Sequence, residues 1–316
     1  MLSWERNTNP NAMMREVQTK SVTWINISRP DEADILYLQE NFDIHPLTIE
    51  EFVTPTFRPK TTSYGNCLFL TIHIPLYDQE ARTTYPGEVD IVLTKTHLIT
   101  GHNTEIYHLE QLFQTMQNNV GKRRLFMSDS PAHLLYTVLE TLLESCFPRL
   151  DNVERKIDNI EDHVFKGNEK AMVKEISFVK RDILNFRRTL KPQRSVLESL
   201  ATKETAFIPK ELIPYFNDLI GTNIRLWNTL ESNKETIESL EDTNESLLSF
   251  KINEKVRIIT IFSAILLPMT LYANIFGMNM GDTPFTESSH SFAIHLAIMF
   301  GISVLTFFLF KWRKWI

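Results

Sequence analysis

The stretch NEKVRIITIFSAILLPMTLYANIFGMN, residues 253–279, decides the fold of this chain. No Asp, Glu, Lys or Arg occurs from Ile258 to Gly281, and none occurs from Ser288 to Phe310. Each run exceeds the roughly 20 residues that a helix needs to cross a bilayer. Buried helices of soluble proteins seldom stay uncharged for so long. We therefore expect two membrane-spanning helices, the first over about 258–277 and the second within 291–316.

The charges beside these runs predict the orientation of the chain. Basic residues lie on the outer flanks of the pair: Lys251, Lys255 and Arg257 before the first run, and Lys311, Arg313 and Lys314 after the second. The connecting loop, 281–290, has no Lys or Arg and carries Asp282 and Glu287. By the positive-inside rule, both termini are cytoplasmic and the loop faces outward. The expected location is the plasma membrane, or the inner membrane of a bacterium, which the chain crosses twice.

Composition argues against several other classes of protein. The chain has 316 residues and a net charge of −6, which argues against a nucleic-acid partner. Cys67 and Cys146 offer no disulfide framework, so we expect two buried, reduced thiols. The N-terminus has no apolar segment typical of a signal peptide. No GxxxxGK[ST], GxGxxG, HExxH or GxSxG motif occurs, so we do not expect an enzyme.

The soluble part begins with a mixed pattern. Runs rich in β-branched and aromatic residues predict strands: VTWINIS, CLFLTIHIPLYD, EVDIVLT and HLITGH. PDEADILYLQENF and HPLTIEEFV predict helices, because they open with acidic residues or proline. His97 and His102 bracket the last strand at an odd spacing, which places them on opposite faces. We expect a cytoplasmic α/β domain over 1–130.

A helical pattern follows. Apolar residues recur at intervals of three and four: Leu142, Cys146, Leu150, Val153, Ile157, Ile160 and Val164. After the turn FKGNEK, a second helix is predicted over about 171–200, so that 131–210 forms a helical hairpin. A stalk helix starts near Pro214 and continues into the first membrane span, over 211–280, with a length of roughly 90 Å. Its cytoplasmic half is sparsely apolar and needs identical neighbours, which predicts a homo-oligomer.

Several segments together carry a family resemblance: TWINI, IHPLTIEEFV, FRPKTTSYGNCLFLTIHIP, LTKTHLIT, KRDILNFRRTLKPQRSVLESL and the opening stretch that ends in Gly277-Met278-Asn279. The chain resembles the CorA family of divalent-cation channels, the bacterial magnesium and cobalt transporters. This resemblance implies an α+β membrane protein that assembles as a pentamer of identical subunits in the lipid bilayer. It implies Mg²⁺ influx, driven by the membrane potential and gated by intracellular Mg²⁺. Co²⁺, Ni²⁺ and Zn²⁺ are further candidate ions.

The Gly-Met-Asn sequence is the expected selectivity filter. Mg²⁺ gives up its water reluctantly, so a protein usually holds it with its waters in place. A ring of Asn279 carboxamides accepts hydrogen bonds from those waters without trapping the ion. Gly277 lets the backbone turn at the end of the helix. The alternative is that Gly277 and Asn279 only terminate a helix.

Helical spacing marks one stripe below this motif: Asn253, Val256, Thr260, Ser263, Leu267, Thr270, Asn274 and Gly277. By resemblance, the pore-lining positions are Asn253, Ile259, Leu267 and Thr270. Asn274 stands where the family usually has a smaller residue, and we include it among the pore-lining positions. Ile259 and Leu267 are expected to narrow the pore as a hydrophobic gate. The alternative for the hydroxyls is a bond back to the preceding turn, which is common in membrane helices.

The family also has a cation sensor between neighbouring cytoplasmic domains. The matching positions are Glu51 and Asp218, with Glu50 and Asp242 as further acidic candidates. Glu51 stands where well-known members have Asp. Unneutralised carboxylates at subunit contacts repel one another, and bound Mg²⁺ bridges them. Solvated surface charge is the alternative for each of these carboxylates.

Two other functions stay open at this point. The first is a zinc transporter of the same fold, resembling ZntB, because the loop MGDTPFTESSH lacks the segment that usually follows Gly-Met-Asn in CorA proteins. His290 and His295, near the outer mouth, could contact a transition metal. The second is a membrane-tethered scaffold without transport.

Overall fold

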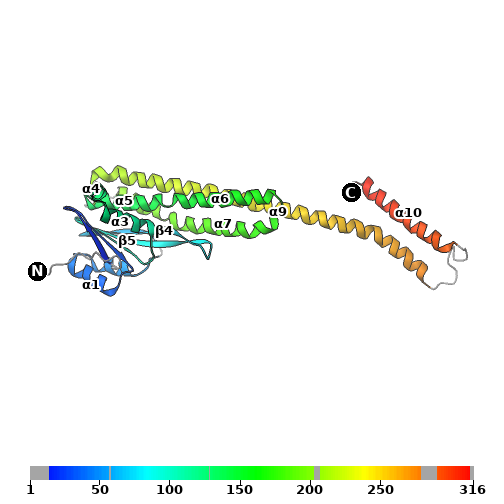
Figure 1. The fold of residues 1–316 in the computed structure, drawn as a ribbon, viewed down its shortest axis with the longest axis horizontal. Helices are drawn as coiled ribbons and strands as arrows, with labels where there is room; N and C mark the ends of the chain where they lie inside the picture. Colours follow the sequence, from blue (N-terminus) through cyan, green and yellow to red (C-terminus); the bar gives the residue numbers. More distant parts are fainter. Residues whose placement is uncertain (1–13, 57, 128, 203–206, 279–289, 314–316) are drawn as a thin grey trace. The chain divides into compact units, whose positions relative to one another are not determined.

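The computed structural model describes residues 14–56, 58–127, 129–202, 207–278 and 290–313. The chain divides into two compact units, Met1–Glu241 and Asp242–Ile316, and Figure 1 traces the elements of each. The finer division of the soluble part, into 1–130 and 131–210, stays a prediction.

A six-stranded mixed sheet organises the first unit. Its strands are β1 (Met14–Gln18), β2 (Thr23–Ser28), β3 (Lys60–Tyr64), β4 (Cys67–Asp78), β5 (Thr83–Leu93) and β6 (His97–His102). They lie in the order β1-β2-β6-β5-β4-β3, and among these strands only β2 and β6 pair in parallel. The four predicted strands are confirmed. The two edge strands, β1 and β3, are not predicted, because they are short and mostly polar.

Two short helices cover one face of the sheet. They are α1 (Glu32–Asn41), which begins with a capping box at Asp31, and α2 (Pro46–Val53), which begins with a proline. Ile49 and Phe52 of α2 pack with Phe69 and Val92 in one buried apolar cluster. A Cβ added to Gly101 would lie 2.2 Å from the ring of Phe52. Glycine at this position therefore lets α2 lie directly on the sheet.

Helices cover the opposite face of the sheet, where α5, α6 and α7 lie on the side away from α1 (Figure 1). They are α3 (Tyr107–Asn118), α4 (Val120–Met127), α5 (Pro131–Glu144), α6 (Phe147–Phe165), α7 (Glu169–Leu190) and α8 (Gln193–Thr202). The rings of Trp24 on β2 and Phe113 on α3 meet edge to face at 5.0 Å. Helix α7 contacts β4 and β5, and α6 contacts α7.

The predicted helical hairpin is correct in outline but wrong in two details. All seven residues of the predicted seam are buried, from Leu142 to Val164. However, this seam is divided between α5 and α6, which are separated at Ser145 and Cys146. The predicted helix over 171–200 is also divided, into α7 and α8. Pro192 causes this break, because it has no N–H to donate and its ring crowds the carbonyl of the preceding turn.

The long helix is confirmed as α9 (Ile213–Gly277), which has 65 residues and contains Pro268. Its N-terminal part packs on the helical hairpin of the same chain: Leu230, Ile237 and Leu240 are buried. Arg187 of α7 forms an ion pair with Glu231 and lies over the Trp227 ring at 5.0 Å. These side chains therefore do not by themselves require a neighbouring subunit, contrary to the sequence-based argument for an oligomer.

The second unit holds the end of α9 and helix α10 (Ser291–Trp312). Both helices are long and apolar enough to cross a membrane. Their large apolar side chains are exposed, including Leu267 at 73% and Phe292 at 80%. Exposed apolar surface on this scale marks contact with lipid or with another protein. Together with their length and composition, it supports the two predicted membrane spans.

The contact between Gly101 and Phe52 yields a test of the fold. Gly101→Ala should lower the free energy of unfolding by about 1–3 kcal/mol, because the new methyl group pushes the Phe52 ring off the sheet. Thermal or chemical unfolding of the full-length protein in detergent measures this. The control is Gly221→Ala in α9, where an added Cβ meets no atom within 4 Å. It should be neutral or stabilising by about 0.5–1 kcal/mol. Equal stability of Gly101→Ala and the wild type would contradict the role assigned to the glycine.

Candidate functional site

The predicted pore-lining residues occupy the face of α9 that points away from α10. Tyr272 and His295 are hydrogen-bonded at 2.7 Å, and the Ser303 hydroxyl lies 2.9 Å from the Met269 sulfur. Leu267 and Asn274 are each two residues from one of these contacts, which is a rotation of about 200° around a helix. Both are exposed. The stripe is therefore left uncovered by α10 of its own chain.

The lower end of the stripe is less sharply defined. Asn253, Ile259 and Thr260 are all exposed, with Ile259 at 65%. The positions from helical spacing and from family resemblance differ here by one residue.

The hydroxyls of the stripe bond to their own helix. Thr260, Ser263 and Thr270 each donate to the carbonyl oxygen four residues earlier, at 2.8, 3.0 and 2.9 Å. The structure thus contains the back-bonded arrangement that was the alternative for these residues. Donating the hydroxyl proton inward leaves the oxygen lone pairs free to accept. Because the waters around a cation point their hydrogens outward, such acceptors suit a hydrated ion.

The filter motif straddles the end of the described helix. Gly277 is the last residue of α9, and Met278 follows it with 59% of its surface exposed. A Cβ added to Gly277 would meet no atom within 4 Å, so packing within the chain does not require a glycine there. Asn279, Asp282 and Glu287 lie outside the described residues.

The four regulatory candidates lie on two helices, α2 and α9. Glu51, on α2, is half-buried and forms an ion pair with Lys60 of β3 at 2.7 Å. Its second oxygen, Oε2, is buried and has no hydrogen-bond partner in the part of the chain that the structure describes. Glu50, Asp218 and Asp242 are exposed, Glu50 on α2 and the other two on α9. Among the described residues, no three His, Cys, Asp or Glu side chains come together as a metal site.

A row of polar side chains beside Glu51 has no counterpart in the sequence-based site. Lys60 of β3 pairs with Thr71 of β4, and Thr71 pairs with Asp90 of β5. The Thr71 hydroxyl donates to Asp90 at 2.6 Å. Burial raises the pKa of Asp90 to about 8, against the opposing effect of the Thr71 hydrogen bond. Asp90 could have been flagged as an acid within an apolar strand, but nothing in the sequence links Lys60 to Glu51.

The remaining candidates have structural partners. His97 stacks edge-on against Phe42, while His102 bonds the Thr104 carbonyl through Nδ1, so the two histidines do not share a site. Burial lowers the pKa of both. His295 is held by Tyr272, as described above. Cys67 and Cys146 are buried free thiols, as predicted.

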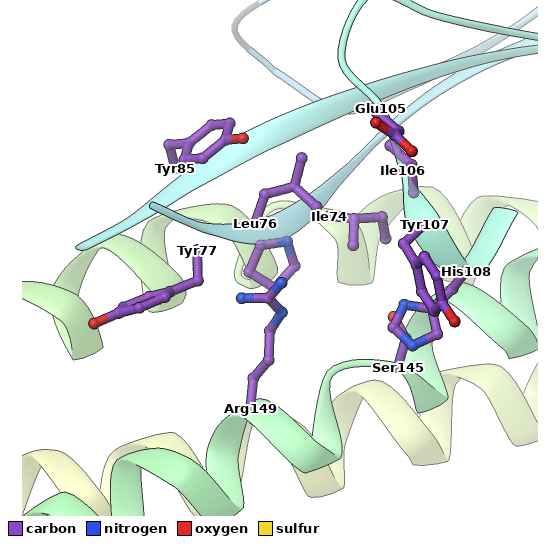
Figure 2. A pocket seen from close by; sticks show the side chains of 11 residues that line it. Ile74, Leu76, Tyr77, Tyr85, Glu105, Ile106, Tyr107, His108, Ser145 and Arg149 are labelled. Atoms are coloured by element: carbon purple, nitrogen blue, oxygen red, sulfur yellow. The ribbon is translucent and has the colours of Figure 1, made fainter. Parts of the chain in front are cut away.

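Figure 2 shows a pocket of about 300 Å³ beside the ends of β4 and β5. Its lining combines three tyrosines with Glu105, His108 and Arg149. Arg149 extends from the first turn of α6 toward the strand residues around Leu76 (Figure 2). None of the predicted site residues lines this pocket, so neither the ion path nor the metal sensor is assigned to it.

Comparison with known proteins places the chain in a family. The model described as "CorA-like Mg2+ transporter protein" matches residues 19–312, and the chain belongs to this family. A cobalt/magnesium transport protein CorA from Thermotoga maritima is 28% identical over 312 residues, covering 98% of this chain and 88% of that protein. A zinc transport protein ZntB from Yersinia enterocolitica is 20% identical, covering 93% of this chain and 88% of that protein.

A solved structure has the same fold. The complete structure of the CorA magnesium transporter from Methanocaldococcus jannaschii matches with a TM-score of 0.83 and 21% sequence identity. The match covers 95% of this chain and 94% of that one. The predicted fold, an α/β soluble domain followed by a long helix and two C-terminal apolar helices, is thereby confirmed.

The raised pKa of Asp90 predicts how stability depends on pH. An unfolded aspartate loses its proton near pH 4, whereas folded Asp90 keeps it to about pH 8. The folded state therefore binds more protons in this window, and its stability falls as pH rises through it. Asp90→Asn removes this effect, and its Oδ1 still accepts from Thr71. Relative to the wild type, the variant should gain about 1 kcal/mol or more between pH 5 and pH 8.

Unfolding free energies of the full-length protein at several pH values measure the effect. Asp158→Asn, at an exposed position on α6, is the matched control. A pH dependence that is the same in Asp90→Asn and the wild type would show that Asp90 is ionised in the folded protein at neutral pH.

Proposed function

We propose that this protein is a homo-oligomeric membrane channel that admits divalent cations, with Mg²⁺ as the main ion. The observation that carries the proposal is the uncovered stripe of α9, which runs to Gly277 on the face away from α10. Copies arranged around an axis would enclose this stripe as an ion path, whereas a single chain leaves it open. The names of the family model and of the Thermotoga maritima relative support magnesium and cobalt.

The ion path would select cations by the water molecules that they keep bound. Asn279 supplies one carboxamide oxygen from each subunit, and this ring accepts hydrogen bonds from the waters held by Mg²⁺. Asn274 supplies a second amide ring below it, and the Thr270 oxygens add acceptors. An Asn within a membrane span is costly unless it meets water or a partner, which fits a position that faces the path. Five subunits are implied by family resemblance.

Apolar side chains would form the gate. Leu267 and Ile259 are exposed on the uncovered face, and rings of them would narrow the path and exclude water. Asn253 lies at the cytoplasmic end of the path. An ion that has shed few of its waters cannot pass a dry constriction, so subunits must move apart for conduction.

The membrane potential would drive the ion. With both termini in the cytoplasm, as the flanking charges predict, a divalent ion that enters at −100 mV gains about 4.6 kcal/mol. Influx therefore needs no chemical coupling step. The absence of a nucleotide-binding motif from the sequence fits this, and the family is one of transporters.

Intracellular Mg²⁺ would regulate the channel through carboxylates at subunit contacts. Glu51 and Asp218 are the proposed bridge, with Glu50 beside the first and Asp242 further along α9. The buried Oε2 of Glu51 has no donor among the described residues, and this fits a metal ligand, because an ionised oxygen left without a donor is costly. Bound Mg²⁺ would offset the repulsion between carboxylates and hold the closed state.

Zn²⁺ is the second candidate ion, because the chain also matches ZntB and the loop after Gly-Met-Asn departs from the CorA pattern. The lower identity of ZntB favours Mg²⁺. Competition of Co²⁺, Ni²⁺ and Zn²⁺ against Mg²⁺ uptake into proteoliposomes ranks the ions. Proteoliposomes without any divalent flux would instead favour the tethered scaffold.

Asn279→Ala tests the filter. The variant should lose Mg²⁺ uptake into proteoliposomes by at least about tenfold, because the hydrated ion no longer finds the amide ring. Asn253→Ala, at the other end of the path, is the matched amide control and should retain more uptake. Size-exclusion chromatography confirms that both variants assemble. Wild-type uptake by an assembled Asn279→Ala channel would remove the motif from the proposed filter.

Leu267→Ala tests the gate. Truncation widens and wets the constriction, so basal Mg²⁺ flux at high internal Mg²⁺ should rise several-fold. The control is Leu296→Ala on α10, an exposed leucine that does not belong to the stripe on α9. A flux in Leu267→Ala at or below that of the wild type would place the gate at another residue.

A further inference from the structure

The side chain of Lys60 reaches the carboxylate of Glu51 that the proposed sensor uses. Lys60 opens β3, an edge strand, and Glu51 lies on the helix that covers the adjoining face. Their charged atoms are 2.7 Å apart, and the two side chains are 32% and 26% exposed. The Lys60 ammonium also lies 5.6 Å from the centre of the Phe69 ring. An ion pair with this degree of burial is less screened by salt than a surface pair.

The surroundings of this ammonium are acidic. Glu51 and Glu88 raise the pKa of buried Asp90 through their charge, and Lys60 lowers it. The ammonium therefore lies close enough to act on both Glu51 and Asp90. One oxygen of Glu51 contacts Lys60, while the other is buried without a partner in the described part of the chain. The carboxylate is thus already half-neutralised by a cation that belongs to its own subunit.

We propose that Lys60 is a tethered competitor of Mg²⁺ at Glu51 and sets the Mg²⁺ concentration at which the sensor fills. This rests on the proposed role of Glu51 in sensing. A metal ion that bridges Glu51 to Asp218 of a neighbouring subunit must displace the ammonium from Oε1 or accept its repulsion. Displacement loses the free energy of the Lys60–Glu51 pair, and a retained ammonium repels the metal ion, so metal binding is weakened in either case. The flexible stem of lysine lets the ammonium swing away without moving the strand.

The test is Mg²⁺ binding to the full-length protein in nanodiscs, measured by isothermal titration calorimetry. Lys60→Met keeps the length of the stem but removes the charge, and Mg²⁺ should bind about fivefold more tightly. That factor corresponds to about 1 kcal/mol at 25 °C. Lys60→Arg keeps the charge and should bind Mg²⁺ as weakly as the wild type or more weakly. Lys166→Met, which removes the same charge from the exposed pair with Asp162, should leave affinity unchanged.

A second set of variants, based on Glu51→Gln, distinguishes the competitor role of Lys60 from the sensor role of Glu51. Glu51→Gln should weaken Mg²⁺ binding, and Lys60→Met added to it should have no further effect, because the pair is already gone. If Glu51→Gln weakens binding but Lys60→Met does not tighten it, the competitor role is wrong and the sensor stands. If Glu51→Gln leaves binding unchanged, both are wrong. Should Lys60→Met fail to assemble, Lys60→Gln takes its place with the same expected tightening.

Discussion

The continuous helical backbone of α9 is the constraint on which the rest of the structure depends. Within hydrocarbon, every N–H and C=O needs a partner inside the protein, and a helix supplies these partners from its own chain. Helix α9 stays helical through Pro268, although proline donates no hydrogen bond. The hydroxyls of Thr260 and Thr270 also bond to this backbone. Only its side chains then distinguish one face of the helix from another.

Those side chains divide the membrane part of α9 into two faces. Met269, Tyr272 and Phe276 contact α10, and their aromatic and sulfur groups fill the space between the two helices. The opposite face keeps Thr270 and Asn274, whose oxygens accept hydrogen bonds. A bilayer tolerates an amide only where it meets water or a partner. The proposed ion path follows from this division of faces, and a single chain provides only one wall of it.

In the soluble unit, charged side chains are stabilised by ion pairs. There, carboxylates are paired within the chain: Glu231 with Arg187, Glu175 with Arg82, and Glu51 with Lys60. Glu51 differs from the other two, because its Oε2 is buried and without a donor in the described residues. A carboxylate that is only half satisfied has free energy to gain from a second cation. This makes the state of Glu51 sensitive to what a neighbouring subunit or a metal ion brings to it.

The sequence by itself determined the two membrane spans, the long helix and four strands. Long uncharged runs and period-two apolar patterns are local signals. Each follows from whether the side chains of one short segment face lipid, the protein core or water. The edge strands β1 and β3 were not predicted, because their residues are mostly polar. They form strands through backbone pairing with β2 and β4. The stripe on α9 was predictable from helical spacing, but its exposure was not.

Only the tertiary structure decided which residues surround Glu51. Lys60, Thr71 and Asp90 form one row because the registers of three strands align them, and Gly101 lets α2 bring Glu51 over that face. Contacts of this kind join side chains from different strands and helices. Their geometry follows from packing and strand register, which leave no local pattern in the sequence.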